Sequence, residues 1–278
     1  MVEATVTKTI QSILLRVYKL AGKKCPECGT EMLVSKQNCI DTQKPMPPMC
    51  PACYYPMSAD KIKDDKLSDI TQLTAMGRKS DAEGYMIGNS IFSNRAITRS
   101  SFQNFNIDMP AQQAMRNQAE KAAQNVVDGE IVHAMFTGGA GVGKSHVAYS
   151  AMRMAVLRSG YNVRAFFLDW QEFLSISREA ISDKNVAKRL DRIKSQFSKA
   201  DLIILEDIGS ERNTDFAADA MDRFWRNRED KSVIITTNLS PKDLTERYGD
   251  RVISRIKKHG HNQGFVAKGI PDQRQTPF

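Results

Sequence analysis

The sequence lacks long hydrophobic runs, which excludes a membrane-spanning helix. Crossing a bilayer takes roughly 20 consecutive apolar residues, whereas the longest candidates here, Ile203–Leu205 and Val233–Ile235, are short and flanked by charged residues. Short apolar runs of this kind are typical of buried strands. The N-terminus also lacks a signal-peptide pattern, because Glu3, Lys8 and Arg16 interrupt any apolar core. We therefore expect a cytoplasmic protein with no membrane contact.

Cysteine is absent outside one N-terminal segment. All five cysteines lie between Cys25 and Cys53, which is not the distribution expected of a secreted protein held together by disulfides. Clustering of thiols in a reducing compartment favours a metal site instead.

The cysteine segment contains two C-x-x-C motifs. Cys25 and Cys28 form the first, Cys50 and Cys53 form the second, and 21 residues separate them. Four thiolates at this spacing predict a tetrahedral Zn²⁺ site, and with no general base beside it the site is expected to be structural. A module below roughly 40 residues needs a bound metal of this kind to fold. Cys39 is left over, as a free or buried thiol or as a replacement ligand.

Acidic residues are in the minority, so the chain carries a formal net charge of +8. A basic surplus suits contact with nucleic acid, whose phosphates supply most of the affinity. The same surplus also occurs in proteins that need it only for solubility. The length of 278 residues is enough for one full α/β domain and a small appendage.

Three regions are predicted along the chain. Region 1–60 is expected to hold an amphipathic helix over residues 1–20 and then the zinc-binding module, whose many prolines predict loops and turns. Region 61–104 is expected to be a helix followed by a linker around Arg78–Ser100. Region 105–278 is expected to be an ATPase domain.

Helical and strand patterns alternate throughout the third region. Alternation of this kind predicts an α/β fold with a mainly parallel sheet covered by helices on both faces. The predicted helices are 110–127, 145–158, 185–197, 216–226 and 243–258, and the predicted strands are 131–136, 163–168, 202–205, 233–237 and 264–267.

A phosphate-binding loop lies between the first predicted strand and the next helix. The segment fits G-x-x-x-x-G-K-S/T at every constrained position. Its glycines let the backbone wrap around phosphates, and the following helix adds the positive end of its dipole. Lys144 would reach the β- and γ-phosphates of ATP, and Ser145 would hold Mg²⁺. The residues expected to contact the nucleotide are Gly138, Gly139, Ala140, Gly141, Val142, Gly143, Lys144, Ser145 and His146.

Two carboxylates end the third predicted strand. Glu206 and Asp207 form a Walker B pair, in which the first acid supports Mg²⁺ and the second polarises the attacking water. The usual order is Asp then Glu, so Asp207 is shorter than the usual catalytic group. A displacement of about 1 Å at a positioned group costs on the order of a hundredfold in rate, which predicts slow hydrolysis.

Polar and basic residues follow the acid pair in the sequence. Asn238 ends the fourth predicted strand, where it could orient water near the γ-phosphate or simply form a turn. Arg251 and Arg255 are spaced four residues apart on one predicted helical face. Either they contact the γ-phosphate of a nucleotide bound by a neighbouring copy and promote its hydrolysis, or they form a solvent-exposed basic face.

Taken together, residues from about 101 to 275 resemble the DnaC/DnaI-type helicase loaders, a branch of the AAA+ ATPases related to the DnaA initiator. This resemblance implies that Arg255 is the arginine finger, that Arg251 is a second basic position of the same helix and that Arg274 is sensor II. The cysteine module is similar in organisation to that of the DnaI-like members. The segments that carry the resemblance are 102–105, 138–145, 202–209, 234–239 and 244–256.

The resemblance implies a function as an ATP-dependent loader. The zinc module would bind a DnaB-type replicative helicase, the ATPase domains would associate side by side, and the helicase would be delivered to single-stranded DNA. Residues proposed to touch that DNA are Lys188, Arg189, Arg192 and Lys194.

Two alternatives remain open at this point. One is an IstB-like transposition helper, which has the same core and would bind duplex DNA and a transposase; the zinc module counts against it. The other is an adaptor that binds ATP without hydrolysing it. The departure of Glu206–Asp207 from the family's usual order keeps this second alternative open.

Overall fold

The computed structural model describes residues 18–25, 29, 31–36, 48 and 70–274. The chain divides into two units, Met1–Gly77 and Arg78–Phe278. Within the described ranges, no helix is both long enough and apolar enough to cross a bilayer.

The described part of the first unit is a β-hairpin. Strand β1 (Tyr18–Lys24) pairs antiparallel with β2 (Glu31–Ser35), and the buried side chains of Cys25 and Met32 pack together. Two predictions are therefore wrong here: the predicted helix does not extend over residues 18–20, and the cysteine segment is not only loop. Pairing between the two strands satisfies their backbone groups, and this context outweighs local propensity.

Residues predicted as a linker are largely structured. Helix α2 (Ile70–Gly88) continues well into the stretch expected to be irregular, and two 3₁₀ helices follow, η1 (Arg95–Arg99) and η2 (Phe102–Asn104). Apolar side chains of α2, of η2 and of the residue after η2 pack in the core of the second unit, which explains why the segment is ordered. These buried residues are Ala82, Met86, Phe102 and Phe105.

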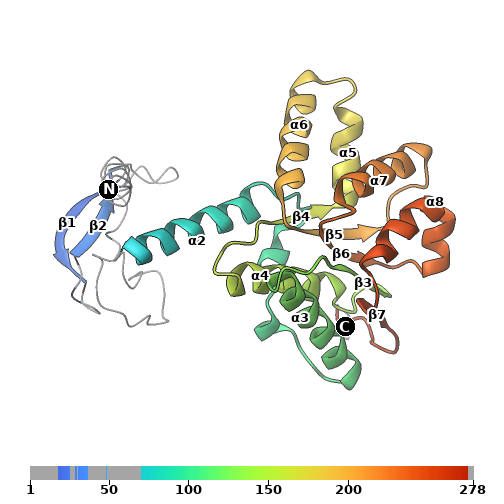
Figure 1. Ribbon diagram of the computed structural model, residues 1–278, viewed down its shortest axis with the longest axis horizontal. Coiled ribbons are helices and arrows are strands. Elements are labelled where there is room, and N and C mark those ends of the chain that lie inside the picture. Colours follow the sequence, from blue (N-terminus) through green and yellow to red (C-terminus); the bar gives the residue numbers. More distant parts are fainter. Residues whose placement is uncertain (1–17, 26–28, 30, 37–47, 49–69, 275–278) are drawn as a thin grey trace. The chain divides into compact units, whose positions relative to one another are not determined.

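Five strands of the second unit form one sheet with the order β4-β5-β6-β3-β7, and every neighbouring pair is parallel (Figure 1). The predicted parallel sheet is therefore confirmed. The strands are β3 (His133–Gly138), β4 (Ala165–Asp169), β5 (Leu202–Ile208), β6 (Ser232–Thr237) and β7 (Gly264–Ala267).

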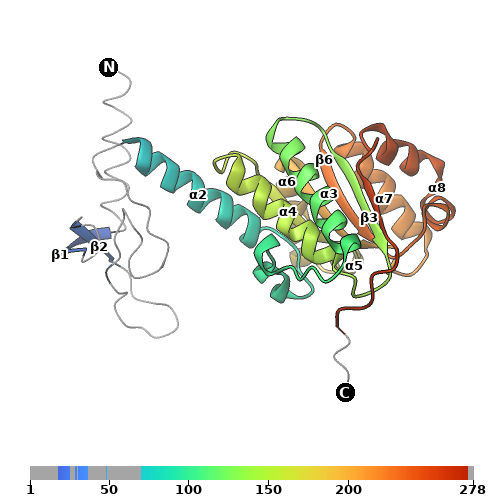
Figure 2. The ribbon, with the colours of Figure 1, turned by 90° about the horizontal axis from the view of Figure 1, so that it is seen from below.

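Helices cover both faces of this sheet (Figures 1 and 2). Alternating strand residues point to opposite sides, so Phe167 and Ile204 pack in one core cluster while Phe166 and Ile203 pack in another. One face carries α3 (Pro110–Val127) and α4 (Lys144–Arg158). The other carries α5 (Trp170–Glu179), which was not predicted, with α6 (Lys184–Lys199), α7 (Asp215–Arg228) and α8 (Pro241–Lys258).

The strand order brings three functional segments together. Strands β5, β6 and β3 are consecutive neighbours, and being parallel they end at the same edge of the sheet. The phosphate loop follows β3, the acid pair ends β5 and Asn238 follows β6. Ligands of open α/β sheets bind at this edge.

Candidate functional site

The phosphate loop adopts a backbone conformation that needs glycine. Gly141 and Gly143 have φ values of 72° and 95°, in the left-handed region. A Cβ on Gly143 would come within 2.7 Å of Phe105 Cε2, so the position has no room for a side chain. Gly143 is also the N-cap of α4, and glycine has no side chain that could cap the first amides of the helix. The first amides of α4 are therefore available to an anion.

Lys144 is held by uncharged acceptors. The residue is only 7% exposed, and Nζ donates to the carbonyl oxygens of Gly138 at 2.9 Å and Gly139 at 2.6 Å and to Asn238 Oδ1 at 2.6 Å. Burial lowers the pKa of Lys144, and the nearby carboxylates of Asp207 and Glu206 oppose that change. The amine is thus fixed beside the loop that the sequence predicts to bind phosphates.

Glu206 points toward the phosphate loop. One carboxylate oxygen accepts a short hydrogen bond from Ser145 Oγ, and the other accepts from Thr236 Oγ1 at 2.7 Å. Burial raises the pKa of Glu206 to about 6, although both hydroxyls act to lower it. The two residues predicted to hold Mg²⁺, Ser145 and Glu206, are therefore in direct contact.

Asp207 points toward the next strand. Its φ of 51° lies in the left-handed region, and its N–H donates to Thr236 Oγ1 at 2.8 Å. Its Oδ1 accepts from Asn238 Nδ2 at 3.3 Å. The two acids thus have different partners, and the Thr236 hydroxyl bonds to both residues. The role of Thr236 was missed, although it lies two positions before the predicted Asn238.

These groups line one cavity of 420 Å³. Its wall includes six predicted residues with ionisable or hydroxyl side chains: Lys144, Ser145, His146, Glu206, Asp207 and Arg274. Asn238, Ala140, Gly141 and Gly143 lie there too, so the cavity unites the loop with the acid pair. Arg274 reaches it because the neighbouring Gln273 N–H donates to Gly141 O at 3.0 Å.

One wall of the cavity was missed by sequence reasoning. Ala96, Ile97 and Ser100, from η1 and the residue after it, line the site. The only sequence feature that marks this turn is Asn94, whose side chain accepts from the Ala96 N–H at 2.8 Å as an N-cap. Without a long periodic pattern, such a short turn is not detectable from the sequence.

The two arginines of α8 that were predicted as site residues, Arg251 and Arg255, are not among the described residues that line this cavity. They follow Gly249, where the helix is broken by a φ of 79° and a ψ of 163°. Arg255 Nη1 pairs with Asp222 Oδ1 at 2.5 Å and its Nε with Glu229 Oε2 at 3.5 Å. Arg251 is exposed.

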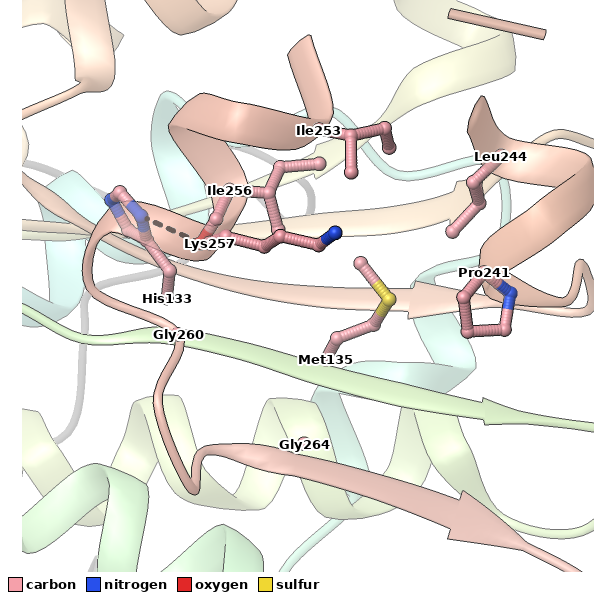
Figure 3. Close-up of a pocket in the computed structure, with 9 residues that line it drawn as sticks. All are labelled: His133, Met135, Pro241, Leu244, Ile253, Ile256, Lys257, Gly260 and Gly264. Carbon is pink, nitrogen blue, oxygen red and sulfur yellow. Dashed lines mark hydrogen bonds between the residues drawn. The ribbon is translucent and has the colours of Figure 1, made fainter. Parts of the chain in front are cut away.

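A second cavity, of 190 Å³, lies between α8 and strands β3 and β7 (Figure 3). Its walls are mostly apolar, with Met135, Leu244 and Ile253 among them. Its titratable side chains are His133, whose pKa is lowered by burial, and Lys257. The first cavity, which holds the predicted residues, is therefore the candidate site.

The predicted zinc ligands fall mainly outside the described residues. Cys25 is buried at the end of β1, whereas Cys28, Cys50 and Cys53 lie outside those residues, as does Cys39. In the described ranges, no group of three His, Cys, Asp or Glu side chains could hold a metal ion. The zinc site therefore stays a prediction.

The sequence is similar to the replicative helicase loader DnaC of Escherichia coli strain K12. The two are 24% identical over 161 residues, which cover 56% of this chain and 62% of that protein. The chain therefore spans less than two thirds of this curated relative.

The fold is that of the AAA+ P-loop domain. A crystal structure of the DnaC helicase loader shares it at a TM-score of 0.52 and 21% identity, covering 62% of this chain and 99% of that one. A crystal structure of DnaI shares it at a TM-score of 0.52 and 20% identity, covering 66% and 96%. Residues 99–261 match the model of the IstB-like ATP binding proteins, more than half of the chain, and the chain belongs to this family.

Proposed function

We propose that this chain is an ATP-dependent loader that delivers a DnaB-type replicative helicase to single-stranded DNA. One observation carries the proposal: the phosphate loop, the acid pair and Asn238 line a single cavity in a chain similar to a replicative helicase loader. The charged α6 surface and the cysteine module add support.

The donor set of the cavity fits ATP and Mg²⁺. The free amides at the start of α4 and the Lys144 amine suit the phosphates, and Ser145 with Glu206 offers two oxygen ligands of the kind Mg²⁺ prefers. Bound ATP would supply the γ-phosphoryl group for hydrolysis. Asp207 would accept a proton from water that Asn238 helps to hold, and the short Asp207 side chain makes turnover slow.

We propose that the chain self-associates, and the positions of the arginines support this. Arg274 lines the chain's own cavity and is proposed to sense the nucleotide bound there. Arg255 and Arg251 lie on the second part of α8, away from that cavity. We propose that Arg255 completes the site of a neighbouring copy.

Helix α6 is the proposed contact for single-stranded DNA. Its apolar face is buried through Leu190, Ile193 and Phe197, and its exposed face carries one acid, Asp191, among six basic side chains. Such a surface attracts a phosphate backbone. The exposed basic residues are Lys184, Lys188, Arg189, Arg192, Lys194 and Lys199.

The cysteine module is the proposed contact for the helicase. We propose that Cys25, Cys28, Cys50 and Cys53 hold one Zn²⁺ as a structural site. Support comes from the C-x-x-C spacing and from the β1–β2 hairpin, whose first strand ends directly before the buried Cys25. Zinc would fix the fold of this small unit.

A second candidate is a transposition helper that binds duplex DNA and a transposase. The description of the matching family, IstB-like ATP binding protein, favours it. The paired C-x-x-C motifs favour the loader. A third candidate is an adaptor that binds ATP without turnover, and the Glu206–Asp207 order favours it over a fast ATPase.

The test is to mix the purified chain with the replicative helicase of its own host and ATP, and to measure the mass of any complex by size-exclusion light scattering. The variants are Cys50→Ser and Lys144→Ala, with Cys39→Ser as the matched cysteine control. We expect one zinc per chain, a complex that Cys50→Ser abolishes, and an altered complex with Lys144→Ala.

Cys39→Ser should behave as the wild type in that experiment. Absence of a complex in every nucleotide condition would rule out the loader, and binding to a transposase and duplex DNA would then support the second candidate. A measurement of ATP turnover with helicase and DNA present separates an enzyme from an adaptor.

A further inference from the structure

A buried charged cluster connects the loop after the acid pair with helix α8. We call Glu211, Arg247 and Tyr248 the Glu211 cluster. Glu211 Oε1 accepts hydrogen bonds from the Tyr248 hydroxyl and, at 3.2 Å, from Arg247 Nε, while Arg247 Nη2 donates to the Glu211 backbone carbonyl. The side chains of Glu211 and Arg247 are only 2% and 14% exposed. None of the three was predicted as a functional residue.

On one side, the cluster fixes the loop that follows Asp207. Glu211 Oε2 accepts from the Gly209 N–H at 2.8 Å, and the Ser210 hydroxyl donates to the Asp207 carbonyl at 2.8 Å. Gly209 has a φ of 93°, and a Cβ there would come within 2.3 Å of Leu239 Cδ1. The loop is therefore packed tightly, and a displacement of Asp207 would move Glu211.

On the other side, the cluster includes the last turn of α8 before the helix is broken at Gly249. Arg247 and Tyr248 directly precede Gly249, whose φ of 79° and ψ of 163° interrupt the helix. The residues after the break carry Arg251 and Arg255. The first part of α8 is thus tied to the acid-pair loop, and the break at Gly249 separates it from the second part.

Anchoring α8 does not by itself require a buried ion pair. Leu244, Val252 and Ile256 already bury the apolar face of the helix. A buried ion pair costs desolvation energy, and well-packed apolar residues of similar volume often stabilise at least as well. What the pair adds is a fixed geometry between two elements, because its hydrogen bonds are directional.

We propose that the Glu211 cluster is a positioning device that couples the state of the acid pair to the Arg251–Arg255 segment. The inference rests on the proposed function, in which Asp207 meets ATP and Arg255 serves a neighbouring copy. A change at Asp207 moves the loop, the loop moves Arg247 and Tyr248, and the segment after Gly249 is released from or held against α7. The cluster acts only through these other residues.

The test compares two tyrosine hydroxyls in the full-length chain. Tyr248→Phe removes a bond to Glu211, and the matched control Tyr85→Phe removes the bond to the Gln196 carbonyl, outside the cluster. Glu211→Gln is a third variant. ATP affinity is measured with a fluorescent ATP analogue, and amide hydrogen exchange of residues 250–258 is measured with and without ATP and Mg²⁺.

We expect ATP to change the exchange rate of residues 250–258 by about fivefold or more in the wild type and in Tyr85→Phe. In Tyr248→Phe and Glu211→Gln that response should vanish, while the ATP dissociation constant stays within about threefold of the wild type. A merely structural cluster would lower the melting temperature yet leave the response intact, and that result overturns the inference.

Two further outcomes are informative. If the wild type binds ATP but residues 250–258 do not respond, the coupling does not exist, while the proposed ATP-dependent function survives. If the wild type fails to bind ATP, the proposed function itself is wrong and the inference falls with it.

Discussion

Charged side chains in the second unit have two different kinds of partner. Around the phosphate loop their partners are uncharged: Lys144 donates to two carbonyls and an amide oxygen, and Glu206 accepts from two hydroxyls. On the second part of α8 their partners are opposite charges, since Arg255 pairs with Asp222 and Glu229.

This difference shows which region is prepared for a ligand and which must first exchange partners. A charge whose hydrogen-bond partners are all neutral gains a strong new interaction when an ion of opposite sign binds. An arginine already paired with two carboxylates must give up those pairs, so its transfer to another site costs energy. On the proposed function, the first region would bind the nucleotide and the second would change its partners on assembly.

The largest expected effect comes from removing the cation of the first region. Lys144→Ala should weaken ATP binding by about a hundredfold or more, because the phosphates lose their charged partner in a half-buried site. Titration with a fluorescent ATP analogue measures it, and Lys121→Ala, an exposed lysine of α3, is the control. Equal affinities of the two variants would contradict the assignment of the cavity.

Exchanging the two acids tests the first region further. In the double variant Glu206→Asp and Asp207→Glu, the longer carboxylate is at position 207, next to Asn238. It should reach the attacking water better, so kcat for ATP hydrolysis should rise by about tenfold. The single variant Asp207→Asn should abolish turnover while ATP still binds. A double variant no faster than the wild type would show that the acid order does not limit hydrolysis.

Much of the first region could be predicted from the sequence, because its constraints are local. The loop Gly138–Ser145 needs glycines at fixed positions, and the acid pair must follow an apolar strand. The alternation of helices and strands also predicted the parallel sheet and placed β7 at its observed residues, Gly264–Ala267. Requirements that fix the spacing of residues within a short segment leave a pattern that can be recognised in the sequence.

The ion pairs of α8 could not be predicted, because no sequence motif marks which distant residues meet. Arg255 meets Asp222 on α7, and Glu211 meets Arg247 across 36 positions. Nothing in the spacing of Arg251 and Arg255 revealed these ion pairs. The same reason explains the errors at the N-terminus, where pairing between β1 and β2 decided the structure of residues expected to be helix and loop.

The second region can be changed by releasing Arg255. Asp222 carries hydrogen bonds from Arg255 and Arg226, which outweigh the effect of burial and lower the pKa of its carboxyl. Asp222→Asn removes that charge, so Arg255 is easier to transfer to a neighbouring copy. We expect ATP-dependent self-association to strengthen by about threefold, measured by analytical ultracentrifugation.

The control for that variant is Glu246→Gln, which removes the acid of an exposed pair with Lys242 on the first part of α8. It should leave self-association unchanged, because that pair does not involve Arg255 and is screened by solvent. If both variants behave alike, the ion pairs of Arg255 do not restrain assembly.

The smallest expected effect is on stability, and it depends on pH. The pKa of Glu206 is about 6 in the folded protein and 4.5 in an ordinary glutamate, so the folded state favours the protonated carboxyl. Its stabilising contribution is complete below pH 4.5 and is lost as the pH rises through 6. Glu206→Gln does not titrate, so without nucleotide its melting temperature should exceed that of the wild type by about 4 °C at pH 7 and by much less at pH 4. Thermal unfolding at both pH values measures the difference. An offset equal at the two pH values would show that the pKa of Glu206 is not raised in the folded protein.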